Sequence, residues 1–164
     1  MGYISLPRIF TGLLAALTLC LCPCFAGAAP TEDMPAVKTF WFTRSGMSAG
    51  QGRSYSVRET KRGRFVWIDL YYSCHYVLPM TDEDMAAFST LLHELNLTEW
   101  NGFRKSDPDV LDGEDFSLSV VFADGDEISA YGSNSFPSGY EDKMSRIEDF
   151  FRTLMVDYEI NILE

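Results

Sequence analysis

Cysteine is scarce in this sequence, and its distribution excludes several kinds of protein. Three of the four cysteines, Cys20, Cys22 and Cys24, lie in an N-terminal apolar segment, and only Cys74 follows it. Once that segment is removed, neither an internal disulfide framework nor a four-cysteine zinc site can form. The domain must therefore be held together by a packed apolar core, which a chain of this length can supply.

Signatures of catalysis and of cofactor binding are also few. No phosphate-binding loop and no dinucleotide fingerprint is present, and the Gly-Ser-Asn-Ser sequence at 132–135 lacks the strand-turn-helix glycine pattern of a serine nucleophile. Cys74 and His75 are neighbours in a predicted strand and point to opposite faces, so they do not form a nucleophile and base. Cys74 shares the parity of the apolar residues of that strand, so we expect it to be buried as a small apolar side chain. Because His75 and His93 show no paired ligand spacing, the sequence predicts no zinc site.

The N-terminus has the pattern of a secretory signal peptide over residues 1–28. Arg8 precedes an apolar run from Ile9 to Phe25, and the small residues Ala26-Gly27-Ala28 follow. We expect cleavage between Ala28 and Ala29. The mature chain would then be exported to the periplasm, the cell surface or the medium.

Two alternatives for this segment stay open. An uncleaved run of about 21 apolar residues could nearly span the roughly 30 Å of bilayer hydrocarbon, although Pro23 weakens this interpretation. The other alternative is acylation of Cys20, Cys22 or Cys24, but no small residue precedes any of them. Membrane contact is thus predicted only through an uncleaved or lipidated N-terminus.

The rest of the chain predicts a linker over residues 29–36 and one α+β domain over 37–164. Strand patterns cover 37–44, 54–60, 65 towards 76, 116–122 and 127–132, and helix patterns start at Thr81 and at Tyr140 and end near Asn96 and Asp157. Thr81 suits a helix N-cap, with acidic residues in the first turn. The order β-β-β-α-β-β-α predicts an antiparallel sheet of about five strands with both helices on one face.

Charge is distributed unevenly along the chain. Residues 38–64 carry seven bases and one acid, whereas residues 65–164 carry five bases and 21 acids. The large negative total argues against nucleic-acid binding, which needs a dominant basic surface. Either the basic segment pairs with acids of the same chain, or it meets an anionic partner such as an envelope polymer, a lipid headgroup or an acidic protein face.

Strand alternation selects a candidate ligand-binding surface. Trp67, Asp69, Tyr71 and His75 lie opposite in parity to the apolar residues of the third predicted strand, and Arg58 lies opposite to Tyr55 and Val57. If the helices cover the other face, these side chains form an open sheet surface. Such a surface can stack on a sugar ring or peptide and bind its polar groups. The parity of the first strand is ambiguous, because Phe40 and Phe42 compete with Val37 and Trp41 for the core.

An acidic loop suggests a weak calcium site. Asp107, Asp109 and Asp112 place oxygen ligands close together, and calcium binds six to eight oxygens. The loop departs from the EF-hand pattern, because Leu111 takes the third ligand position. Solvated loop acids are the alternative explanation.

A resemblance covers the segment from Trp100 to Tyr140. It includes Trp100, Gly102-Phe103, Asp124-Gly125, Gly132-Ser133-Asn134 and Phe136-Pro137. This segment resembles a family of small exported bacterial proteins, lipoproteins among them, that has no assigned activity. The resemblance implies a bacterial, extracytoplasmic protein and implies no catalytic or binding residue.

Together these features predict a non-catalytic binding or accessory protein of the bacterial cell envelope that contacts its ligand or partner through the open sheet face. Two alternatives are a secreted hydrolase that uses carboxylates and a subunit of an envelope assembly. Two acids with shifted ionisation in one concave pocket would favour the hydrolase.

Overall fold

The computed structural model describes residues 35–46, 52–70, 74–110 and 113–163. The predicted signal peptide and most of the predicted linker, as well as Tyr71 and Asp112, lie outside the described residues. Within them the chain is an α+β domain, as predicted, with one sheet and two long helices.

The sheet has seven strands in the order β4-β3-β2-β1-β6-β7-β5. Their bounds are β1 (Val37–Gly46), β2 (Arg53–Thr60), β3 (Gly63–Leu70), β4 (Cys74–Pro79), β5 (Arg104–Ser106), β6 (Glu114–Phe122) and β7 (Glu127–Ser133). All neighbouring strands pair antiparallel except β5, which runs parallel to β7.

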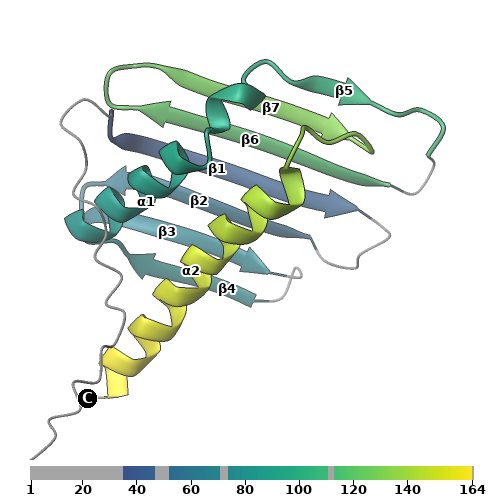
Figure 1. The fold of residues 1–164 in the computed structure, drawn as a ribbon. Helices are drawn as coiled ribbons and strands as arrows, with labels where there is room; N and C mark the ends of the chain where they lie inside the picture. The colour runs from purple at the N-terminus through teal and green to yellow at the C-terminus, as the bar shows by residue number, and fades with distance from the viewer. Residues whose placement is uncertain (1–34, 47–51, 71–73, 111–112, 164) are drawn as a thin grey trace, which may run out of the picture.

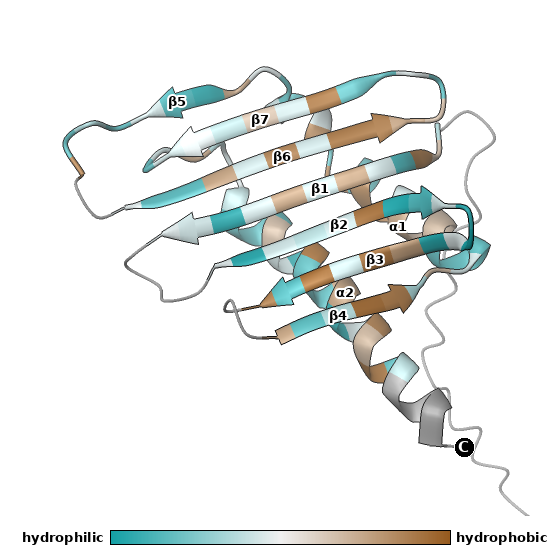
Figure 2. Cartoon of the chain, turned by 180° about the vertical axis from the view of Figure 1, so that it is seen from behind, coloured by the Kyte–Doolittle hydropathy of each residue, from teal (hydrophilic) through white to brown (hydrophobic). Residues whose placement is uncertain are grey.

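The helices are α1 (Asp82–Glu94), the short 3-10 helix η1 (Leu97–Trp100) and α2 (Tyr140–Leu163). Thr81 caps α1 as predicted, since its side chain accepts from the Asp84 backbone N–H while the Asp84 side chain accepts from the Thr81 N–H. Figure 1 shows α1 and α2 on the same side of the sheet, with α2 running across the strands and beyond β4. Seen from behind in Figure 2, no described helix covers the strands.

The two faces of the sheet therefore differ, and we call them the covered face and the open face. On the covered face the rings of Phe40 and Phe88 lie 5.1 Å apart, and Phe151 of α2 stacks on Tyr55 at 4.9 Å. This packing resolves the parity of β1. Phe40 and Phe42 are buried in the core, so Trp41 faces the open side.

The prediction of about five antiparallel strands was wrong. The third predicted strand continues towards Tyr76, whereas β3 ends at Leu70 and β4 returns antiparallel from Cys74. Residues 71–73 (Tyr-Tyr-Ser) carry no glycine, proline or asparagine, so the sequence offers little sign of a reversal there. The observed order is β-β-β-β-α-β-β-β-α.

Strand β5 was missed for a different reason. It has only three residues, Arg104, Lys105 and Ser106, all of them exposed, so it shows no alternation of polar and apolar positions. It is held by parallel pairing to β7, a tertiary contact that local sequence does not encode.

Cys74 also departs from the prediction that it is buried. It has the parity of the covered face, but it is exposed because β4 is the edge strand of the sheet. None of the helices that the structure describes combines the length and the apolar character needed to span a bilayer.

Candidate functional site on the open face

The open face brings together four of the five predicted ligand-binding residues. The register places Arg58 of β2 opposite Phe65, and Asp69 of β3 opposite His75 of β4. Trp67 lies between Phe65 and Asp69 on the same face. Tyr71 lies outside the described residues.

Arg58 and Trp67 contact each other on this surface. The guanidinium carbon of Arg58 lies 4.4 Å from the centre of the Trp67 indole, a cation–π distance. Arg58 also donates from Nη2 to Ser56 Oγ at 3.3 Å. The guanidinium is thus held in one place by two contacts, and its other N–H groups, which have no partner among the described residues, are left to bind a ligand.

A second tryptophan lies in line with the first. The register puts Ser56 directly opposite Trp41 on one side and opposite Trp67 on the other. Trp41 is 45% exposed, a large fraction for the central strand of a seven-stranded sheet. Sequence reasoning did not include Trp41, because alternation alone could not decide which face of β1 is buried.

We call the line of residues through these two indoles the tryptophan row. It crosses six strands at right angles to their direction and comprises Val77, Trp67, Ser56, Trp41, Ser119 and Ser129. The row places two aromatic rings and several hydroxyl groups on the open face.

Asp69 is the hydrogen-bonded centre of the neighbouring row. Its carboxylate contacts His75 Nδ1 at 2.5 Å and accepts from Ser54 Oγ at 3.0 Å. The hydrogen bond with His75 lowers the pKa of Asp69. Burial raises this pKa, and the hydrogen bond from Ser54 lowers it further. Ser54 and His75 both bind the carboxylate of Asp69 and not each other, so these three side chains do not form a catalytic triad.

A hollow of about 380 Å³ lies at this end of the face. It is lined by Thr43, Arg44, Ser45, Gly52, Arg53, Ser54, Asp69 and His75. Hydroxyl groups, a carboxylate and an imidazole thus border a shallow polar depression beside the tryptophan row.

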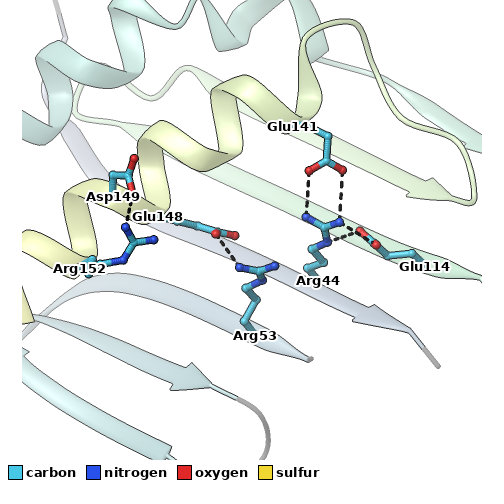
Figure 3. A network of polar contacts seen from close by, with 7 residues as sticks. All are labelled: Arg44, Arg53, Glu114, Glu141, Glu148, Asp149 and Arg152. Carbon is cyan, nitrogen blue, oxygen red and sulfur yellow. Dashed lines mark hydrogen bonds and ion pairs between the residues drawn. The ribbon is translucent and has the colours of Figure 1, made fainter. Parts of the chain in front are cut away.

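On the covered face, two arginines tie the sheet to α2 (Figure 3). Arg44 donates to Glu114 at 2.8 Å and also contacts Glu141 at 3.2 Å, while Arg53 contacts Glu148 at 2.6 Å. Burial raises the pKa of Glu148, although Arg53 opposes this shift. Burial alone would lower the pKa of Arg44, but its hydrogen bond to Glu114 and nearby negative charge outweigh burial and raise that pKa.

The basic segment therefore divides into two groups. Arg44, Arg53 and Arg64 pair with acids from the later part of the chain, the last with Asp82 at 2.7 Å. The remaining bases, Lys38, Arg58, Lys61 and Arg62, make no ion pair among the residues that the structure describes. Pairing within the chain thus holds for Arg44, Arg53 and Arg64, whereas an anionic partner for the other bases stays a prediction.

The predicted calcium loop is only partly described. Asp107 and Asp109 are exposed, and Asp107 accepts from the Asp109 backbone N–H at 3.1 Å. Across residues 35–46, 52–70, 74–110 and 113–163, no group of three acidic, histidine or cysteine side chains is arranged to hold a metal ion. Weak calcium binding with Asp112 stays a prediction.

The arrangement gives little support to hydrolysis. Asp69 and Glu148 have shifted pKa values, but they line different hollows. The sequence contains one Gly-x-Ser-x-Gly pattern, at residues 46–50, of which only Gly46 lies among the described residues. It joins the antiparallel strands β1 and β2 and not a strand to a helix, so it lacks the context of a nucleophile elbow.

A scan against protein-family models, a search of curated proteins and a search of solved structures each found no match. The function is therefore inferred from the chemistry of the two faces.

Proposed function

We propose that this protein is a non-catalytic binding module of the bacterial cell envelope, and that it holds an anionic ligand on the open face of its sheet. The observation that carries the proposal is the Arg58 guanidinium, stacked on Trp67 and without a carboxylate partner among the described residues, next to the exposed indole of Trp41.

Exposed aromatic surface supports this assignment. Burying apolar area releases roughly 25 cal/mol per Å², so a large indole left in water is a surface from which a ligand can gain binding energy. Val77, which is 52% exposed and lies opposite Trp67 in the register, extends the apolar area on the same face. Contiguous apolar area of this kind marks interaction sites on soluble domains.

Charge supports an anionic ligand. Lys61 and Arg62 form the turn that joins β2 to β3, close to Arg58 in the chain, and both are exposed. These bases lie on a chain with a formal net charge of −11, so they form a local positive area on an acidic molecule. Such a local field steers and orients an anion more than it adds to affinity.

The cellular location rests on the predicted signal peptide and on the family resemblance of the Trp100–Tyr140 segment. Both favour export, and an exported binding protein meets the anionic polymers of the envelope. If the N-terminal segment is acylated or stays uncleaved, the protein would be held at the membrane. The binding face would be the same in either case.

Co-sedimentation with bacterial envelope preparations tests the proposal. We expect the purified protein to pellet with the envelope and to be released by salt, and we expect Arg58→Gln and Trp41→Ala each to reduce the bound fraction several-fold. The control is Glu94→Gln on α1, which is exposed on the helical side. Equal pelleting of all four proteins would contradict the proposal.

An envelope assembly subunit is the second candidate, favoured by one observation. β4 is an edge strand with Val77 half exposed, α2 extends past this edge (Figure 1), and Val156 of α2 is 50% exposed. Light scattering distinguishes the candidates, because an assembly subunit would show a molar mass several times that of one chain.

A further inference from the structure

We infer that the ligand of the open face is an extended polysaccharide whose sugar rings carry carboxylates, and that it lies across the strands along the tryptophan row. This inference rests on the proposed function and names the chemical class of the ligand.

The spacing of the two indoles is the first argument. Trp41 and Trp67 occupy matched positions on β1 and β3, with Ser56 of β2 between them. Neighbouring strands lie about 4.8 Å apart, so the two side chains start roughly 10 Å apart. Alternate rings of an extended β1→4-linked hexose chain repeat at close to this interval. One such chain can therefore place one ring on the exposed Trp41 indole and the next ring but one at Trp67, over the Arg58 guanidinium that covers the Trp67 ring and buries Ser56.

The chemistry of the row is the second argument. A pyranose ring has an apolar C–H face that stacks on indole and a rim of hydroxyl groups that need hydrogen-bond partners. The row continues beyond Trp41 with Ser119 and Ser129, both partly exposed. Serine hydroxyls both donate and accept, as a hydroxyl rim requires.

The position of Arg58 is the third argument. Its guanidinium contacts Ser56 Oγ and the Trp67 ring, so it lies on the row itself, at two of its neighbouring positions. A carboxylate on a ring bound at this point would meet a planar donor held by stacking. A neutral polysaccharide would leave that charge without a partner.

The overall charge argues for a single polymer chain and against an anionic membrane surface. The protein carries a formal net charge of −11, and a broad surface of the same sign would repel it. A single polysaccharide strand contacts only the row and the bases near Arg58, and so avoids most of that repulsion.

Calorimetric titration with two matched hexasaccharides tests the inference. β1→4-linked hexamannuronate and β1→4-linked mannohexaose differ only in the carboxylate on each ring. We expect mannohexaose to bind about tenfold more weakly or worse, as for the loss of one charge-assisted hydrogen bond. Arg58→Gln should abolish this difference, because it removes the charge and keeps a polar side chain.

The variants Trp41→Ala and Trp67→Ala should weaken both ligands about tenfold, a loss in the range found for stacking contacts. The matched control is Tyr131→Ala, which removes an exposed aromatic ring of the open face outside the row. It should leave both affinities within about twofold of the parent. The disaccharide of mannuronate should bind far more weakly than the hexamer, because it is too short to reach both indoles.

Three outcomes would overturn the inference: equal affinity for the two hexasaccharides, equal affinity for the disaccharide and the hexamer, or binding to anionic phospholipid vesicles without binding to hexamannuronate. If envelope binding still depends on Arg58 and Trp41 while hexamannuronate fails to compete, the proposed function stands and the assignment to polysaccharide is wrong. Loss of the envelope binding itself contradicts the proposed function.

Discussion

The covered face and the open face are built from alternate residues of the same strands, yet they differ in the kind of interaction that each makes. On β1, Phe40 and Phe42 are buried against the helices while Trp41 between them is 45% exposed. On the covered face arginines pair with glutamates of other elements, whereas on the open face Arg58 stacks on an aromatic ring. We interpret the first face as the source of stability and the second as the surface for recognition.

Removing a large aromatic from each face should give the widest contrast in stability. Phe151 is fully buried among Phe40, Tyr55 and Phe88, so Phe151→Ala should lower the free energy of unfolding by about 3–5 kcal/mol. Trp41→Ala should cost less than about 1 kcal/mol, because much of its side chain is already in water. Urea unfolding measures both. Equal losses would mean that the open face is part of the core.

The same substitution of two arginines gives the next largest contrast. Arg44→Met leaves Glu114 without its partner in a poorly solvated place, and we expect a loss of about 3 kcal/mol. Arg58→Met should cost less than about 1 kcal/mol, because no carboxylate among the described residues depends on it. Envelope binding should show the opposite order. A stable Arg44→Met variant that fails to bind would invalidate the division between the faces.

The smallest expected effect concerns acid stability. Folding lowers the pKa of Asp69, so its contribution is present above the unfolded pKa of about 3.9 and is lost as the pH falls through the lower folded value. We expect the Asp69→Asn variant not to show this loss of stability at acidic pH. The loss in the parent protein should be under about 1 kcal/mol, because Asp69 and His75 are both partly exposed. Unfolding curves at several acidic pH values measure it. Ser54→Ala, which removes only the second hydrogen bond, should give a smaller change.

Sequence patterns predicted those parts of the fold whose information is local. The alternation of apolar and polar residues around Phe116 and Val120 identified β6. Thr81 and the acidic residues that follow it identified the start of α1. The segment between β3 and β4 carries no glycine, proline or asparagine, and β5 depends on pairing with β7, so neither feature could be predicted. Only the coarse α+β class is confirmed.

The candidate surface could be predicted in part, and for a partly wrong reason. Asp69 and His75 were assigned to one face of a continuous strand, whereas they face each other across an antiparallel pair of strands. The assignment to a common face survives because directly opposed residues of paired strands lie on the same side of a sheet. Trp41 was missed because both parities of β1 carry large apolar side chains, and only the helices decide between them.

The indole N–H signals of the three tryptophans test the central claim most directly, in a titration of the isotope-labelled protein with soluble envelope polysaccharide. Trp41 and Trp67 lie on the open face, while Trp100 is buried on the helical side and donates to the Ser138 carbonyl at 3.2 Å. We expect the signals of Trp41 and Trp67 to shift together in a saturable manner and that of Trp100 to stay in place. A shift confined to Trp100, or no saturable shift of Trp41 and Trp67, would contradict recognition through the open face.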